Sequence, residues 1–214
     1  MQDFKEGIVS GLRYAFKKGS SAHSPLLVGV HGKAGTLFVL HALASTYPKD
    51  FGVVYFEASS PDSLGGFSWW DFDPTTDQID AQWEKALPSA EQLALAIQGC
   101  IANEGLAPSQ KFAIGFSQGG GLLSVLAQSQ TTLFSKLAIL ASFVVKAPFV
   151  PSLKNLSCFW AHGELDDRIS IETARRGANY LVAKGASLQF VTDSVGHKVG
   201  SQGMRALKEF WTTP

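Results

Sequence analysis

The chain has 214 residues, enough for one compact α/β domain that buries about 70% of the surface its unfolded form exposes. Lys plus Arg and Asp plus Glu are equal at 18 each, which excludes a global field that would recruit nucleic acid or an anionic membrane. No stretch approaches about 18 consecutive apolar residues and no signal-peptide pattern opens the chain, so we expect a cytoplasmic protein without stable membrane insertion.

Short apolar runs rich in β-branched residues alternate with helical patterns along the chain. The expected strands cover residues 26–30, 52–56, 111–116, 137–143, 158–161 and 188–192. The expected helices cover about 36–44, 90–103, 118–128, 171–184 and 203–211. Residues 11–19 could be a strand of an N-terminal hairpin or the tail of a helix, and we favour the strand. This alternation predicts a mostly parallel sheet with helices on both faces, in a single domain spanning residues 1–214.

Residues 59–89 interrupt the alternation with a long irregular stretch rich in Gly, Asp, Pro and aromatic residues. Such stretches in compact domains are usually binding loops or lids. Four aromatic residues stand within six positions of it: Phe67, Trp69, Trp70 and Phe72. Their rings could line a substrate pocket, or Trp69 and Trp70 could anchor the loop to the core. The sequence leaves both interpretations open.

Residues 115–119 read Gly-Phe-Ser-Gln-Gly and stand between a predicted strand and a predicted helix. This is the G-x-S-x-G nucleophile elbow in the setting it requires. A serine on a sharp turn projects its hydroxyl outward, and the flanking glycines let neighbouring backbone approach closely. The pentapeptide alone is a weak signal in a chain with 21 glycines, so Ser117 needs partners elsewhere in the chain.

A nucleophilic serine needs a general base and a carboxylate that orients it, in the chain order Ser, acid, His. Of the five histidines, His197 alone follows both Ser117 and the carboxylates after the strand at 158–161. We therefore predict His197 as the general base. Glu164, Asp166 and Asp167 are all available as the acid within one turn.

A resemblance to a known family narrows the choice of acid. Residues 162–169, His-Gly-Glu-Leu-Asp-Asp-Arg-Ile, resemble the H-G-x-x-D-x-x-V segment of the carboxylesterase, lysophospholipase and acyl-protein thioesterase family of α/β-hydrolases. Residues 115–120 reproduce that family's G-F-S-Q-G-G elbow, and residues 196–197 match its G-H near the C-terminus. The resemblance implies the α/β-hydrolase fold and Asp166 as the catalytic acid, with Asp167 kept as the alternative.

Backbone amides are expected to stabilise the oxyanion of the tetrahedral intermediate. One is the N–H of Gln118, the residue after the nucleophile. The other comes from the loop after the strand at 26–30, where His-Gly-Lys-Ala-Gly resembles the family's H-G-x-G loop. The resemblance implies the N–H of Lys33 as donor, although Ala34 replaces the family's glycine. A similar S-W-F-D stretch in the family implies that the aromatic loop lies beside the active site.

No motif predicts a metal or a cofactor. The loop around Lys33 lacks both the first glycine and the Ser or Thr of a phosphate-binding P-loop, and no metal-ligand spacing is present. Cys100 and Cys158 each lie in an apolar segment, so we expect two buried reduced thiols rather than a disulfide.

The expected reaction is a two-step acyl transfer, from a small-molecule ester to Ser117 and then to water. A thioester or a lysophospholipid would suit the same chemistry, and the sequence leaves the substrate and the oligomeric state open. Two alternatives keep the same fold: a peptidase or amidase with the same triad, and a non-catalytic ligand-binding protein.

Overall fold

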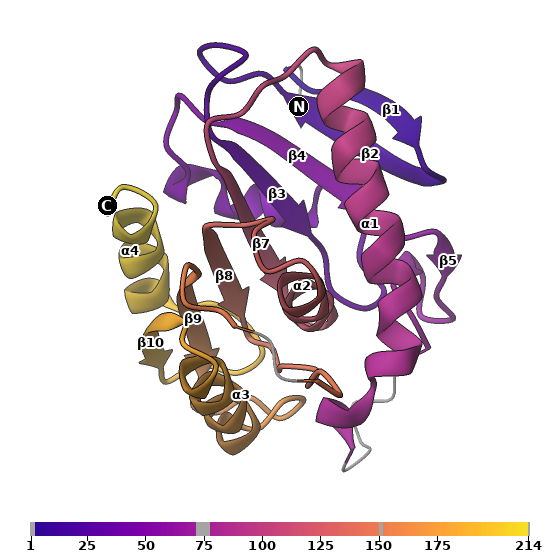
Figure 1. Ribbon diagram of the computed structural model, residues 1–214. Helices are drawn as coiled ribbons and strands as arrows, with labels where there is room; N and C mark the ends of the chain where they lie inside the picture. Colours follow the sequence, from indigo (N-terminus) through magenta and orange to yellow (C-terminus); the bar gives the residue numbers. More distant parts are fainter. Residues whose placement is uncertain (1–2, 72–77, 150–151, 214) are drawn as a thin grey trace.

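A mostly parallel sheet forms the centre of the computed structural model, which describes residues 3–71, 78–149 and 152–213. Its strands are β1 (Lys5–Val9), β2 (Leu12–Lys17), β3 (Leu26–Val30), β4 (Gly52–Glu57), β7 (Lys111–Phe116), β8 (Lys136–Leu140), β9 (Ser157–Gly163) and β10 (Ser187–Asp193). Their spatial order within these residues is β1-β2-β4-β3-β7-β8-β9-β10 (Figure 1). Neighbours from β4 to β10 are parallel, and the N-terminal hairpin is antiparallel. The predicted sheet, including a strand within residues 11–19, is confirmed.

Helices cover both faces of the sheet, as predicted. They are α1 (Trp83–Asn103), α2 (Gln118–Ser129), α3 (Ile171–Ala183), α4 (Ser201–Phe210) and the 3₁₀ helix η1 (Val39–Thr46). Helices α1, α2 and α3 pack on one face, and α4 and η1 pack on the other. Every residue of β3 is therefore buried, with Val28 and Val30 in one core and Leu27 in the other. Burial on both faces explains why the parallel strands read as continuous apolar runs.

Two helix predictions need correction. Helix α1 begins at Trp83 rather than near residue 90, because burial of Trp83 and Ala86 outweighs the backbone hydrogen bond that Pro88 cannot donate. The helix predicted at 36–44 is instead the 3₁₀ helix η1, which has fewer residues per turn and is displaced toward the C-terminus. Its apolar spacing indicated a helix but not the type of helix.

The strand predicted at 137–143 ends earlier, at Leu140. Ala141, with a φ of 43°, turns the chain out of the sheet at that point. This sharp turn brings the next residue, Ser142, under the elbow that follows β7.

The segment predicted as irregular, 59–89, is more regular than expected. It contains a two-stranded hairpin, β5 (Ser60–Pro61) with β6 (Phe67–Ser68), a short 3₁₀ helix η2 (Ile79–Ala81) and the first turns of α1. Phe67 also pairs with Gly35 in an isolated antiparallel bridge. The hairpin therefore borders the loop after β3. Phe72 lies outside the described residues.

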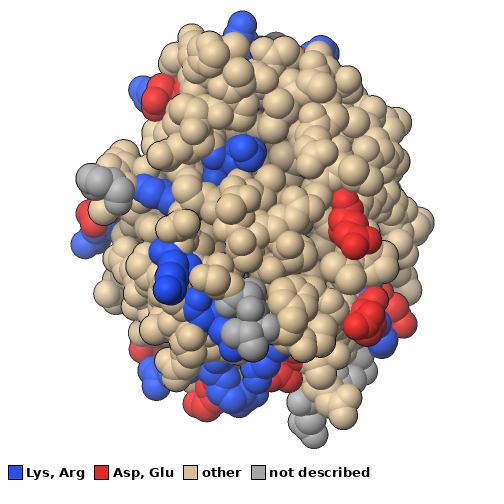
Figure 2. All heavy atoms as spheres, viewed as in Figure 1, with Lys and Arg blue, Asp and Glu red and all other residues tan. Residues whose placement is uncertain are grey.

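The two cysteines are free and buried, which confirms that prediction. Burial raises the pKa of each thiol to about 12. Figure 2 shows small groups of basic and acidic side chains on a largely uncharged face, consistent with the balanced composition. Among the described helices, none combines the length and the apolar character needed to cross a bilayer.

Candidate active site

Three polar residues meet where parallel strands end. Ser117 directly follows β7, Asp166 follows β9, and His197 follows β10. The carboxyl ends of parallel strands share one edge of a sheet, which is where ligands bind in open α/β folds. The structure thus brings together the three side chains that the sequence predicted as a group.

Ser117 occupies a strained turn between β7 and α2. Its φ of 51° and ψ of −122° fall in a region that costs a non-glycine residue about 1 to 3 kcal/mol. The N–H of Ser117 donates to the carbonyl oxygen of Leu140, and the hydroxyl of Ser142 donates to the carbonyl oxygen of Ser117. These contacts hold the turn so that the Ser117 hydroxyl points toward His197.

Glycine at position 119 is required by the close approach of β3. A Cβ atom there would lie 2.3 Å from the carbonyl oxygen of Val30 and 2.5 Å from that of His31. Backbone atoms cannot move aside, so Gly119→Ala is expected to lower the unfolding free energy by about 2 to 3 kcal/mol. Urea denaturation measures this.

Gly196→Ala is the matched control, because a Cβ atom at Gly196 meets only the Leu165 carbonyl oxygen, at 3.7 Å. It should change the unfolding free energy by less than about 1 kcal/mol, the range for a Gly-to-Ala change where alanine fits without strain. Equal losses in the two variants would contradict the tight fit at Gly119.

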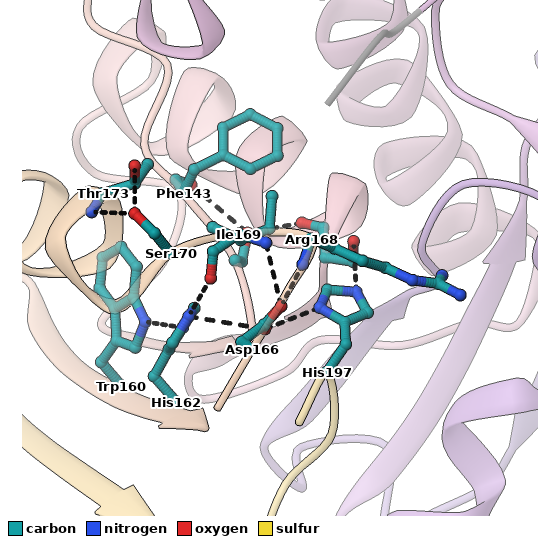
Figure 3. A network of polar contacts seen from close by, with 11 residues as sticks. Phe143, Trp160, His162, Asp166, Arg168, Ile169, Ser170, Thr173 and His197 are labelled. Carbon is teal, nitrogen blue, oxygen red and sulfur yellow. Dashed lines mark hydrogen bonds and ion pairs between the residues drawn. The ribbon is translucent and has the colours of Figure 1, made fainter. Parts of the chain in front are cut away.

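A continuous chain of hydrogen bonds links the three side chains, and Figure 3 shows its contact between His197 and Asp166. His197 Nε2 lies 3.0 Å from Ser117 Oγ, and His197 Nδ1 lies 2.8 Å from Asp166 Oδ2. The Asp166 side chain is fully buried and that of His197 is 10% exposed. This is the geometry in which a carboxylate fixes the imidazole tautomer and leaves Nε2 free to accept the hydroxyl proton.

Asp166 is held as a carboxylate despite its burial. Burial by itself raises its pKa, but hydrogen bonds from His197 and from the amides of Ile169 and Arg168 outweigh it, so the pKa is lowered. The two amides donate to Oδ1 at 2.9 Å each. Asp167, the alternative acid, is exposed. Within the described residues, no hydrogen bond joins Asp167 to His197.

His162 lies on the other side of Asp166 from His197 (Figure 3). Its Nε2 is 2.8 Å from the carbonyl oxygen of Ile169 and 3.5 Å from Asp166 Oδ2. The indole N–H of Trp160 points at Nδ1, 3.4 Å away. Burial lowers the pKa of His162, so we expect a neutral ring at neutral pH. This ring covers the side of the Asp166 carboxylate that faces away from His197. The sequence marked this residue only as part of a motif.

The two residues whose amides are predicted for the oxyanion both lie near Ser117. Lys33 borders the same pocket as Ser117, and Gln118 is the first residue of α2. In the described part of the chain, neither backbone N–H has a hydrogen-bond acceptor. Ala34 has a φ of 56°, the left-handed conformation that glycine adopts readily. Ala34 therefore has a backbone conformation typical of glycine, although it replaces the glycine of the H-G-x-G pattern.

The β5–β6 hairpin forms an ion pair and a hydrogen bond with the loop that follows β3 and contains Lys33. Lys33 Nζ lies 2.9 Å from Asp62 Oδ2, and Asp62 also accepts from the Ser68 hydroxyl and the Leu64 amide. The Ala34 amide donates to Ser68 Oγ at 3.2 Å. Hydrogen bonds from Ser68, Leu64 and Lys33 lower the pKa of Asp62 to about 2. Asp62 is therefore ionised at neutral pH, and its negative charge balances the positive charge of Lys33.

His31 fixes the start of that loop from within. Its Nδ1 is 2.7 Å from the carbonyl oxygen of Gly32, and its Nε2 accepts from the Ala58 amide at 3.0 Å. A ring that accepts at one nitrogen and donates at the other is neutral. Burial lowers the pKa of His31 from its ordinary value of 6.5, in agreement with that role.

Stability is expected to fall as the pH drops below about 6.5. The folded-state pKa values of His31 and His162 are lowered, so below the unfolded value the unfolded chain binds more protons than the native state. Urea denaturation at about pH 7.5 and about pH 5.5 measures the loss.

The control for this loss is His23→Gln, which changes an exposed ring and should leave the pH dependence unaltered. In a His31→Gln variant the decline should be smaller, because one of the two buried rings is gone. An unfolding free energy that is equal or higher at the lower pH would contradict the neutral state of both rings.

Trp69 and Trp70 are used to attach the aromatic loop. The Trp69 indole N–H donates to the His31 carbonyl oxygen, and the Trp70 indole N–H donates to Gln82. Both side chains are buried. The Gln118 side chain accepts from the Trp69 amide and donates to the Trp70 carbonyl oxygen. These contacts favour the anchoring interpretation of the two indoles over the pocket interpretation.

A pocket of about 190 Å³ opens at Ser117. Its described lining residues are Gly32, Lys33, Ala34, Gly35, Val39, Phe116, Ser117, Arg168, Ile169 and His197. Phe67, Trp69 and Trp70 do not border it. Sequence reasoning missed Val39, Arg168 and Ile169 as lining residues, although Arg168 stands only two positions after Asp166. Among the described residues, no three His, Cys, Asp or Glu side chains gather as a metal site.

Comparisons with solved structures agree with the fold. The carboxylesterase of Mesorhizobium loti superimposes with a TM-score of 0.86 at 18% identity, covering 99% of this chain and 100% of that one. The Bacillus cereus carboxylesterase has a TM-score of 0.83 at 18% identity, with 94% and 93% covered. SOBER1 of Arabidopsis thaliana has a TM-score of 0.72 at 19% identity, with 87% and 97% covered. At these identities the likeness shows a shared fold.

Sequence comparison identifies the family. No curated protein sequence matches the chain significantly. The model of the phospholipase/carboxylesterase family, however, matches residues 25–213, which is nearly the whole chain. This protein has the α/β-hydrolase fold, belongs to the phospholipase/carboxylesterase family and is a carboxylic ester hydrolase.

Proposed function

We propose that Ser117, His197 and Asp166 are the catalytic triad and that the enzyme cleaves its ester through an acyl-enzyme on Ser117. The observation that carries the proposal is the unbroken hydrogen-bond chain from Ser117 Oγ through both nitrogens of His197 to the buried Asp166. A serine, a base and an orienting carboxylate in this arrangement are what nucleophilic acyl transfer requires.

In the first step, His197 Nε2 takes the proton of Ser117 as Oγ attacks the ester carbonyl. The negative charge that develops on the carbonyl oxygen would be met by the N–H groups of Lys33 and Gln118, which have no acceptor within the described residues. Each such donor contributes about 3 to 4 kcal/mol in comparable sites. His197 then returns the proton to the departing alcohol, and the acyl group stays on Ser117.

In the second step, water takes the place of the alcohol. His197 accepts a proton from that water as it attacks the acyl-enzyme. His197 then returns the proton to Ser117 Oγ as the bond between Oγ and the acyl carbon breaks, and the carboxylic acid leaves. Asp166 keeps His197 oriented throughout and stabilises the imidazolium, without itself taking the proton. The lowered pKa of Asp166 supports this role, because it keeps the carboxylate ionised.

The size of the pocket bears on the length of the acyl group. Its volume of about 190 Å³ is below the range of about 300–1,000 Å³ that accommodates drug-sized ligands. We propose that small acyl groups are cleaved faster than long ones.

A series of p-nitrophenyl esters from acetate to palmitate, compared with the matched p-nitroanilides, tests both parts of the proposal. We expect kcat/KM to be highest for the short esters and far lower for the anilides. Preferred cleavage of anilides would instead indicate an amidase or peptidase, and a preference for long chains would contradict the size argument. Inclusion of a thioester and a lysophospholipid identifies the type of ester.

A further inference from the structure

One wall of the pocket carries a cation that the triad does not use. Three of the described lining residues are ionisable, namely Lys33, Arg168 and His197, and none of the ten is Asp or Glu. A pocket lined by basic groups without a carboxylate favours a negatively charged ligand.

The lysine and the arginine that line the pocket differ in their partners. Lys33 Nζ is 2.9 Å from Asp62 Oδ2, so its charge is already balanced by a carboxylate that is 4% exposed. The Arg168 guanidinium, by contrast, forms no ion pair with any residue that the structure describes. It is exposed and faces the pocket that holds Ser117.

The backbone of Arg168 is fixed by the catalytic machinery. Its amide donates to Asp166 Oδ1 at 2.9 Å, and Asp166 Oδ2 contacts His197. The Asp166 carboxylate therefore positions both the His197 imidazole and the Arg168 backbone, from which the Arg168 side chain extends. Figure 3 shows this side chain extending past the His197 ring, on the side away from His162. Arg176, on α3, instead hydrogen-bonds Thr173 and does not border the pocket.

A guanidinium is suited to a particular class of ligand. Its planar fork of N–H donors binds a carboxylate or a phosphate through two parallel hydrogen bonds, and it stays charged at every physiological pH. Placed in the wall of a pocket of about 190 Å³ that also contains Ser117, it is within the same small space as a bound ester.

We propose that Arg168 forms an anion subsite beside Ser117 and that the preferred substrates are small esters carrying a carboxylate or a phosphate group. The inference rests on the proposed function, since it assigns the substrate class of that same site. It makes Arg168 a specificity-determining residue, which binds the charged end of the substrate while Ser117 reacts with the ester carbonyl.

Matched ester pairs that differ in charge test the subsite. Monomethyl glutarate and methyl glutaramate place a carboxylate or a neutral amide on the acyl side, and acetylglycolate and acetylglycolamide place them on the alcohol side. Acetoxyethyl phosphate and its dimethyl ester form the phosphate pair. For at least one pair, we expect the enzyme to favour the charged member by about tenfold or more in kcat/KM, the range of charge-assisted hydrogen bonds. The favoured pair identifies the position and type of the anion.

Variants assign the preference to the side chain. Arg168→Gln should reduce the charged-to-neutral ratio to about one, and Arg168→Lys should leave an intermediate ratio, because an ammonium keeps the charge but loses the planar fork. Arg176→Gln is the control and should leave the ratio unchanged. Added salt should weaken the preference of the wild-type enzyme. Equal use of charged and neutral members by the wild type, or a preference that survives Arg168→Gln, would overturn the subsite.

A failure of the proposed function gives a different result. If no ester of any pair is cleaved, the acyl-transfer proposal is wrong, and calorimetric titration with glutarate and with inorganic phosphate then decides the subsite. Binding of either anion by the wild type that is lost in Arg168→Gln would support the anion site. Absence of binding, or equal binding by both proteins, would overturn it.

Discussion

Replacing Ser117 with alanine is expected to lower kcat for ester hydrolysis by about 10⁴-fold or more, because Ser117 is the only hydroxyl or thiol among the described residues that line the pocket. The fold should persist. The turn is held by the backbone of Ser117 and the hydroxyl of Ser142, whereas the Ser117 hydroxyl hydrogen-bonds only His197 among the described residues. Initial rates on a short p-nitrophenyl ester measure the loss.

Two further measurements make this result decisive. Circular dichroism and the thermal midpoint of Ser117→Ala should match those of the wild type, which excludes unfolding as the cause. Ser129→Ala, a change at the other end of α2, should keep nearly full activity. Retention of more than a few per cent of the wild-type rate by Ser117→Ala would remove Ser117 from the mechanism.

The second large effect separates the two candidate acids. Asp166→Asn is expected to lower kcat by about 10⁴-fold, since an amide N–H facing His197 Nδ1 would stabilise the wrong tautomer of the ring. The Asn side chain still has a carbonyl oxygen for the Arg168 and Ile169 amides, so the loop should remain folded. Steady-state kinetics over a range of substrate concentrations measures kcat and KM separately.

Asp167→Asn is the matched control for that experiment. It makes the same chemical change one residue along, at an exposed position, and should change kcat by less than about threefold. The opposite ranking of the two variants would transfer the role of the acid to Asp167. Similar losses in both would indicate that the loop, rather than one carboxylate, determines activity.

Much of this fold could be predicted because its signals are local. The buried parallel strands read as apolar runs, and β3, β7 and β9 lie where those runs stand. The elbow could be recognised for a related reason. The backbone of Val30 and His31 leaves no room for a Cβ at position 119, so only glycine fits there and the sequence motif records this requirement.

Other elements depended on contacts between distant segments. The start of α1 could not be read from Pro88, because burial of Trp83 by the tertiary structure determines it. The function of Trp69 was equally ambiguous, since an indole can fill a pocket or anchor a loop. Its hydrogen bond to the backbone of His31 becomes visible only in the folded chain.

The candidate site shows the same division. Chain order and a strand-end position predicted the grouping of Ser117 and His197, because parallel strands bring their carboxyl ends to one edge. The sequence could not predict the contact of His162 with Asp166 or the ion pair of Asp62 with Lys33. Lys33 and Asp62 are far apart in the sequence. His162 and Asp166 are only four residues apart, but they lie at the end of β9 and in the loop after it, where no spacing rule brings two side chains together.

Reaction with a fluorophosphonate probe tests the central claim most directly, because it reports the reactivity of Ser117 without knowledge of the substrate. Intact mass and peptide mapping should show a single adduct on Ser117 that is absent from Ser117→Ala and forms far more slowly in His197→Gln. A wild-type protein that stays unlabelled, or an adduct on another residue, would contradict the proposed triad.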